Sequence, residues 1–103
     1  MDMEERYRLI MSTIFRALGF RVEVERMLAT GRIDMIVEVP TFIYVLELKL
    51  SNNGGISAAE SQIKEKSYIE PFKADKRKVI ALAVELDETG KGLIDWKEVD
   101  ESL

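Results

Sequence analysis

Residues 32 to 50 read RIDMIVEVPTFIYVLELKL, and this stretch decides the fold. Two runs rich in β-branched and other apolar residues, 32–39 and 42–50, are separated only by Pro40 and Thr41. Strand-like runs this close together predict an antiparallel hairpin, although Pro-Thr is not the turn chemistry that hairpins favour.

The register of this hairpin follows from its short turn. With a loop of either two or four residues, opposed positions sum to 81, which predicts Asp34 opposite Glu47. The same register sets Arg32 opposite Lys49. Because side chains alternate along a strand, Glu47 and Lys49 also share a face. Three polar side chains are therefore expected on one face of an otherwise apolar hairpin.

Two facing carboxylates on an apolar sheet need a compensating charge, because a carboxylate is costly to desolvate. A divalent cation such as Mg²⁺ or Mn²⁺ supplies it, since Asp34 and Glu47 offer hard oxygen ligands and Mg²⁺ completes its shell with water and substrate phosphate. Lys49 is suited to orient a water or to stabilise charge on a phosphorane-like transition state. The pattern predicts metal-assisted phosphodiester hydrolysis. From these three residues alone, a cross-strand charge cluster on a solvated face is the competing interpretation.

Two helices are expected around this hairpin. Residues 3–18 carry apolar side chains three and four apart, with Asp2 as N-cap and Gly19 as C-cap. The expected apolar stripe consists of Met3, Tyr7, Ile10, Met11, Ile14, Phe15 and Leu18. The stretch from Ser57 to Glu60 is typical of a capping box that opens a second helix, which Pro71 ends.

Three further strands complete the expected sheet. Residues 20–25 alternate as a half-buried strand, and residues 79–86 form an apolar run expected to lie parallel to 42–50. Residues 93–99 are expected to form an edge strand whose Trp96 belongs to the core or an interface. The sequence thus predicts one α/β domain over residues 1–103, a mixed sheet of about five strands flanked by two helices in the order α-β-β-β-α-β-β.

Composition narrows the chemistry further. The chain has no Cys and no His, which excludes disulfides and metal ligation by thiolate or imidazole, so any metal must be held by oxygen. No apolar run is long enough to cross a membrane, and the acidic N-terminus is unlike a signal peptide, so a cytoplasmic protein without membrane contact is expected. The net charge of −4 opposes nucleic-acid binding unless basic residues gather on one face.

The residues Gly31-Arg32-Ile33-Asp34, followed after twelve positions by Glu47-Leu48-Lys49, resemble the D…(D/E)-x-K signature of the PD-(D/E)XK nuclease superfamily. The expected order α-β-β-β-α-β is also that of the restriction-endonuclease-like core. More narrowly, the chain resembles the nuclease-like domain found C-terminal to predicted AAA-ATPases. The matching residues are Glu25, Gly31, Arg32, Asp34, Glu47, Lys49, Gln62, Ile63, Lys66 and Tyr68.

This resemblance implies a Mg²⁺- or Mn²⁺-dependent deoxyribonuclease in which Asp34 and Glu47 bind the metal and Lys49 is the catalytic lysine. Gln62 would support the site from the sheet-facing side of the second helix. It further implies DNA as substrate, an AAA-ATPase as partner, and pairing of two copies. Relatives also use a glutamate on the first helix, for which Glu4 fits the apolar stripe better than Glu5.

Other candidates are weaker. Glu25 is either an additional site residue or the outward residue of an edge strand, and Gln62 could serve only to bond a buried carbonyl. Continuing the helical angle turns Tyr68 away from the site. The chain departs from relatives by Arg8 in place of a histidine and Ile33 in place of a proline.

Basic side chains form the last group of candidates for contacts with phosphates, although charge runs are usually only solvated. They are Arg32, Lys66, Lys73, Lys76, Arg77 and Lys78. The alternative function is a catalytically silent module of the same fold that binds an ATPase or another protein. The acidic net charge favours this alternative, and the complete D…E-x-K pattern opposes it.

Overall fold

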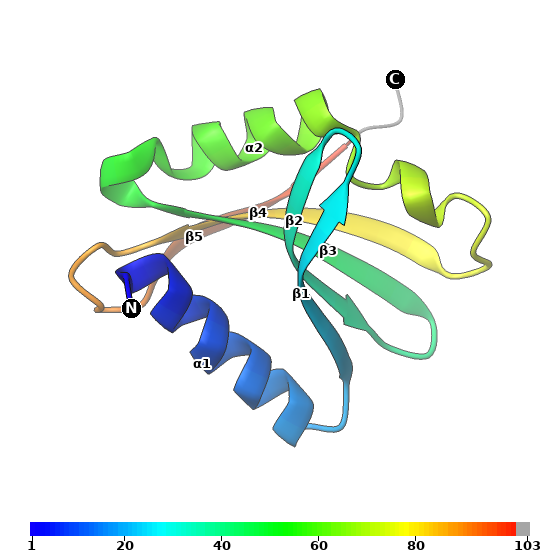
Figure 1. Cartoon of the computed structure of the whole chain (residues 1–103), viewed down its shortest axis with the longest axis horizontal. Helices are drawn as coiled ribbons and strands as arrows, with labels where there is room; N and C mark the ends of the chain where they lie inside the picture. Colours follow the sequence, from blue (N-terminus) through cyan, green and yellow to red (C-terminus); the bar gives the residue numbers. More distant parts are fainter. Residues whose placement is uncertain (101–103) are drawn as a thin grey trace.

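Five strands form one mixed sheet in the computed structural model, which describes residues 1–100 (Figure 1). Their order across the sheet is β1-β2-β3-β4-β5. The strands are β1 (Arg21–Leu28), β2 (Gly31–Glu38), β3 (Phe42–Leu50), β4 (Lys78–Leu86) and β5 (Leu93–Val99). Only β3 and β4 are parallel, and the other neighbours are antiparallel. The strands expected from the sequence are confirmed, as is the parallel pairing of β4 with β3.

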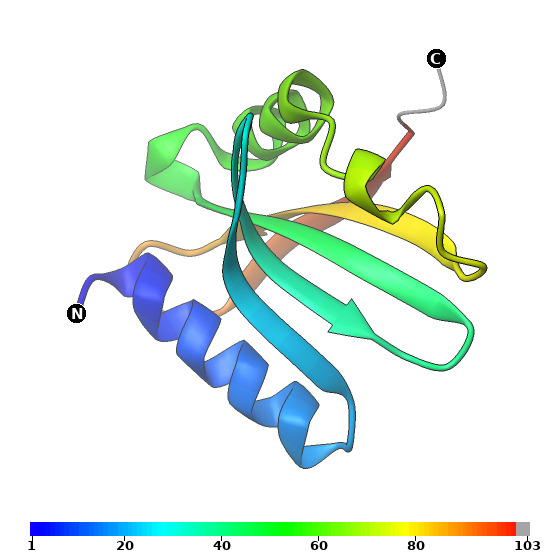
Figure 2. The same cartoon turned by 45° about the vertical axis from the view of Figure 1, so that its right-hand side comes forward.

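One helix packs on each face of this sheet, α1 (Met3–Ala17) on one side and α2 (Gly55–Lys66) on the other (Figures 1 and 2). Two short 3-10 helices, η1 (Ser51–Asn53) and η2 (Glu70–Phe72), flank α2. The α/β fold predicted from the sequence is confirmed, with its restriction-endonuclease-like order of elements. Among residues 1–100, no helix has the length and apolarity needed to span a membrane.

The β2–β3 register is the one that the short turn predicts. Pairs run from Glu38 opposite Ile43 to Met35 opposite Leu46. The ladder ends there, one step before Asp34, whose Oδ2 atom instead accepts the Leu48 N–H at 2.9 Å. The predicted pair between Arg32 and Lys49 is therefore not formed.

The two strands separate because β2 stays paired with β1 as far as Gly31, and the tip of that hairpin packs against α2. Thr30 Oγ1 donates to the Lys66 carbonyl at 2.9 Å. Figure 2 shows the β1–β2 tip rising from the plane of the sheet toward α2. The separation opens a space beside the point where Asp34 and Glu47 leave the ladder.

The stripe expected on α1 is partly wrong. Ile10 and Ile14 are each 52% exposed and Leu18 is 65% exposed, whereas Arg8 and Ser12 are buried. The helix is turned toward β1, because Arg8 forms an ion pair with Glu25 there. The expected caps are confirmed, since Asp2 Oδ1 accepts the Glu5 N–H at 2.8 Å and Gly19 ends the helix in the left-handed region.

The capping box expected for α2 is also wrong. The helix begins at Gly55, after the left-handed Gly54, and Ser57 lies inside its first turn. Glu85 on β4 satisfies the helix start instead, accepting the Ile56 N–H at 2.9 Å. The helix ends at Lys66 because the next residue, Ser67, adopts φ 50° and ψ 54°, well before Pro71.

Candidate active site

An open cavity of about 350 Å³ lies where β2 and β3 separate, between the two helices. It collects side chains from α1, the β1–β2 hairpin, β3 and α2. Its lining residues are Glu4, Met27, Arg32, Asp34, Glu47, Lys49, Gln62, Lys66 and Tyr68. The cavity therefore brings together all four residues that the sequence predicts as catalytic, with Glu4, Arg32 and Lys66 from the weaker groups.

Asp34 and Glu47 form the acidic centre of the cavity, and each is only 2% exposed. Their side chains are hydrogen-bonded to each other. Burial, followed by the hydrogen bond and the charge of Asp34, raises the pKa of Glu47 from 4.5 to about 9. Near neutral pH, Glu47 is therefore protonated and donates to Asp34, because burial disfavours its charged form and the Asp34 carboxylate repels a second negative charge.

Tyr68 completes the surroundings of Glu47, although the helical angle predicts that it points elsewhere. Its hydroxyl lies 2.9 Å from Glu47 Oε1 and 2.6 Å from the Arg32 carbonyl oxygen. The left-handed Ser67 turns the chain back toward the sheet and buries Tyr68. Burial and the charge of Glu47 raise the pKa of Tyr68, so its hydroxyl stays protonated as a donor.

Gln62 connects Glu47 to Lys49. With its amide oriented to match its neighbours, the amide nitrogen donates to Glu47 Oε1 at 3.0 Å, and the amide oxygen accepts from Lys49 Nζ at 3.0 Å. The lysine ammonium is thus held beside the carboxyl pair by a bridge from α2. This bridge explains why a polar residue occupies the sheet-facing side of that helix.

Glu4 brings a third carboxylate to the cavity wall from the first turn of α1, whereas Glu5 is exposed. Burial and the nearby charge of Asp34 raise the pKa of Glu4, and Lys49, Arg8 and Arg32 oppose that shift. The pKa of Glu4 therefore depends on the charge of Asp34, although the described contacts include no hydrogen bond from Glu4 to Asp34 or Glu47.

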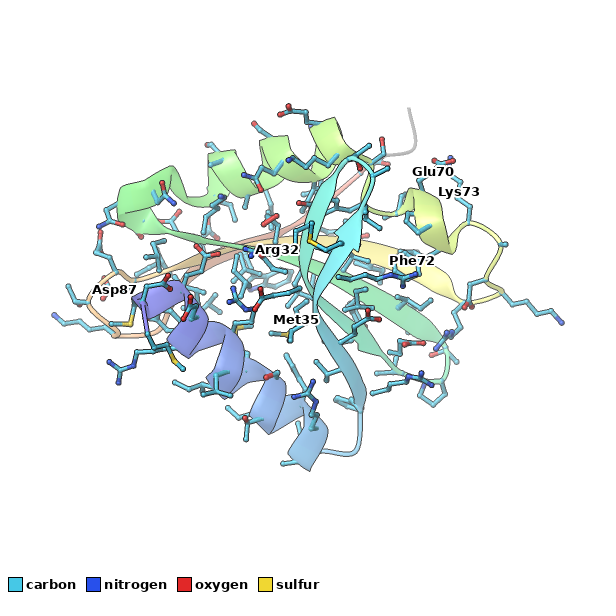
Figure 3. The ribbon with its side chains drawn as sticks, in the orientation of Figure 1. Arg32, Met35, Glu70, Phe72, Lys73 and Asp87 are labelled. Atoms are coloured by element: carbon cyan, nitrogen blue, oxygen red, sulfur yellow. The ribbon has the colours of Figure 1, made fainter. Side chains whose placement is uncertain are left out.

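Arg32 lies near the middle of the molecule, between the two helices (Figure 3). Its guanidinium contacts Asp34 Oδ1 at 3.4 Å and Glu25 Oε2 at 3.3 Å. Glu25 in turn pairs with the buried Arg8 at 3.0 Å. Glu25 thus does not line the cavity itself but pairs with two arginines, and Arg8 ties α1 to β1, the neighbour of the strand that carries Asp34.

Lys66 lines the cavity from the end of α2, and its aliphatic stem crosses Gly31. A Cβ atom added to Gly31, whose φ is 150°, would lie 2.5 Å from Lys66 Cδ. Only glycine allows the lysine to take this path. Met27, which is 72% exposed, adds an apolar group to the same rim.

The remaining basic candidates lie away from the cavity. Lys78 pairs with Phe42 at one end of β3, and Lys49 lies seven residues further along that strand, which corresponds to about 23 Å. Arg77 is bound to Asp75 and Glu38, both at distances below 3.0 Å. Lys73 pairs with Glu70 beyond η2, far from Arg32 in Figure 3. Lys76 is exposed in the same segment.

The donor set of the acidic centre fits a hard divalent cation. A buried carboxyl pair retains a proton because burial and mutual repulsion outweigh the attraction of the nearby Lys49 and Arg32, and a divalent ion that replaces the proton lets both groups ionise. Within residues 1–100, no group of three acidic, histidine or cysteine side chains converges on one point. Two carboxylates suit Mg²⁺, which leaves its other positions to water and phosphate.

A mixed sheet that presents two carboxylates and a lysine in an open cavity is the arrangement that the D…E-x-K pattern of the sequence predicts. A family profile for the PD-(D/E)XK nuclease superfamily matches residues 2–96. The chain belongs to this superfamily, whose nucleases generally use divalent metals.

One similar protein, from Azotobacter chroococcum mcd 1, is described as an uncharacterized protein in the vnfD 5′ region. It is 30% identical over 97 residues, which make up 94% of this chain and 18% of that protein. The chain therefore spans less than a fifth of the length of this relative. No solved structure matches the chain significantly.

Proposed function

We propose that this domain hydrolyses phosphodiester bonds of DNA with Mg²⁺ or Mn²⁺. The observation that carries the proposal is the buried Asp34–Glu47 pair, in which burial keeps Glu47 protonated and which is linked through Gln62 to Lys49. Asp34 and Glu47 would hold the metal. When bound, the metal would polarise the scissile phosphate and lower the pKa of a water molecule.

The chain's own residues have separate tasks in this reaction. Lys49, held at 3.0 Å from the Gln62 amide oxygen, presents a fixed cation to charge that develops on the phosphate. Gln62 is a positioning residue, because it acts through Lys49 and Glu47. Tyr68 donates toward Glu47 Oε1 and lowers the pKa of that carboxyl, which favours the ionised form that a metal needs.

Arg32 and Lys66 are the groups that we assign to substrate phosphates. Both lie on the cavity wall, and they bring positive charge to this opening in a chain whose net charge is −4. Arg32 contacts Asp34 when no substrate is bound, so a phosphate would compete for it. Contacts from Lys73, Lys76, Arg77 and Lys78 would require a substrate that extends about 23 Å along β3.

The silent binding module is favoured by the net charge of −4 but by no contact in the cavity, since both carboxylates, the lysine and the glutamine line one opening. The ATPase partner implied by the sequence resemblance stays a prediction. The length of the Azotobacter relative leaves room for further domains in such proteins, and co-purification of this domain with an ATPase from its own source would test the partnership.

The proposal is tested by incubating the protein with mixed single-stranded, duplex and branched DNA in the presence of Mn²⁺. Wild type is expected to cleave at least one substrate. Asp34→Asn, which removes one ligand charge, is expected to lose at least about 100-fold in rate, as is typical when a charged group of a reaction centre is removed. Glu65→Gln, an exposed change on α2, is the matched control and should retain full activity. Equal cleavage by wild type and Asp34→Asn would contradict the proposal.

A further inference from the structure

β5 ends the sheet and exposes three large apolar side chains beside its charged residues Asp95, Lys97 and Glu98. Within residues 1–100, β4 is the only strand that pairs with β5. Leu93, Ile94 and Trp96 of β5 are 59%, 54% and 59% exposed. Proteins usually protect an open edge with charges, prolines or a covering segment, because an open edge is a template for another strand.

We propose that β5 pairs with β5 of a second copy of this chain, antiparallel and centred on Trp96. In this arrangement the two-fold axis passes between the two Trp96 residues, and the two sheets join into one. This interface is separate from the cavity of Asp34 and Glu47, so it does not rest on the proposed chemistry.

Hydrogen bonding at the edge supports this centre. Asp95 Oδ1 accepts the Trp96 N–H at 2.8 Å. A side-chain acceptor at a strand N–H is expected where that donor faces away from the neighbouring strand, since an edge donor otherwise needs water. In the dimer, the Trp96 N–H would instead meet the Trp96 carbonyl of the second copy, as in a hydrogen-bonded antiparallel pair. Asp95 would then be released for another partner.

Charge complementarity argues for a second copy as the occupant. A register centred on Trp96 sets Asp95 of each copy opposite Lys97 of the other, so two opposite-charge pairs form at once. Because Asp95 and Lys97 of β5 match each other in the antiparallel direction, this strand is better suited to pair with a second copy of itself than with an unrelated strand.

The tryptophan contact and the charge pairs of this dimer lie on opposite faces of the sheet. Trp96 lies opposite Val84, which belongs to the core under α1, so both indole rings would lie side by side on that face. Lys97 lies on the α2 side, where its Nζ contacts Glu60 Oε1 at 3.1 Å. One edge strand gives an interface at the small end of the size range, so we expect a dissociation constant on the order of 10 μM.

The experiment is sedimentation equilibrium over a hundredfold range of protein concentration, on wild type and two charge reversals. In a dimer of Asp95→Lys, each new lysine lies opposite Lys97 of the other copy. In a dimer of Lys97→Asp, each new aspartate lies opposite Asp95 of the other copy. Each variant alone is expected to weaken dimerisation at least tenfold. An equimolar mixture restores both opposite-charge pairs, so it is expected to form heterodimers with an affinity within threefold of wild type.

Lys64→Asp is the matched control. It changes the net charge as Lys97→Asp does and removes the other lysine partner of Glu60, which lies 3.3 Å away, but it is not on β5. It should dimerise like wild type, and circular dichroism should show that all variants are folded. A wild type that stays monomeric at every concentration, or a mixture that fails to associate while wild type does, overturns the proposal.

Discussion

Replacing Glu47 with Gln should remove a pH dependence of stability that the buried carboxyl pair imposes. Glu47 binds its proton with a pKa of about 9 in the folded chain and 4.5 as the reference value for the unfolded chain. A carboxyl whose pKa is raised on folding stabilises the fold while it is protonated, and this contribution is lost as the pH rises from 4.5 toward 9. In the absence of metal, wild type is therefore expected to become less stable across this range.

The size of this change in stability follows from the difference between the pKa values of Glu47 in the folded and unfolded chain. Each pH unit between the two pKa values changes the free energy of unfolding by at most about 1.4 kcal/mol, so the change from pH 5 to pH 8 is at most about 4 kcal/mol. For a chain of 103 residues, even half of this change lowers Tm by about 10 °C. The chain has no histidine, so no imidazole contributes to the change over this range. Glu4, whose pKa is also raised, adds a change of the same sign.

The assay is urea unfolding at pH 5, 6, 7 and 8 in a chelating buffer, followed by circular dichroism. Glu47→Gln keeps the shape of the protonated acid and its ability to donate to Asp34, so its free energy of unfolding should change much less with pH than that of wild type. Glu65→Gln, the exposed control, should keep the wild-type slope. A wild-type free energy of unfolding that is constant from pH 5 to pH 8 would refute the reasoning.

Three further changes test the surroundings of the carboxyl pair. Tyr68→Phe removes the hydroxyl that lies 2.9 Å from Glu47 Oε1, so it should cost about 1–2 kcal/mol of stability and shift metal binding to higher pH, as measured by urea unfolding and by Mn²⁺ titration at several pH values. Gly31→Ala forces Lys66 from its path and strains a backbone with φ 150°, so a loss of about 1–3 kcal/mol in urea unfolding is expected. Arg8→Met removes the buried partner of Glu25 and should cost about 1–3 kcal/mol in urea unfolding.

The hairpin at the centre of the fold could be predicted because its register depends only on local features. The two-residue break predicts that the residue numbers of opposed positions add up to the same sum. The pairs from Glu38 to Met35 have this sum. The sequence could not show that the ladder stops at Met35. That end depends on the β1–β2 tip packing against α2, a contact between segments more than thirty residues apart.

The position of Tyr68 could not be predicted by continuing a helix, because the helix ends at Lys66. A single left-handed residue, Ser67, reverses the direction of the chain, and serine carries no strong signal for that conformation. The motif spacing did contain this tyrosine among the residues of the family pattern. The continued helical angle wrongly predicts that Tyr68 points away from the site, although the family pattern includes this residue.

The orientation of α1 shows a different limit of sequence patterns. Apolar spacing predicts that a stripe is buried, but Ile10 and Ile14 of that stripe are exposed. Burial of Arg8 depends on Glu25, a charged partner on another element. Hydrophobic periodicity cannot identify a buried charge whose cost is offset by such a pair.

The most direct test of the central claim, that Asp34 and Glu47 form a metal site in place of a shared proton, is calorimetric titration with Mn²⁺ at pH 7. Measurement in two buffers of different ionisation enthalpy gives the number of protons released on binding. Wild type is expected to bind one Mn²⁺ and to release close to one proton, whereas Glu47→Gln should bind more weakly and release none. Binding by wild type without proton release, or with the same proton release in Glu47→Gln, would contradict the account.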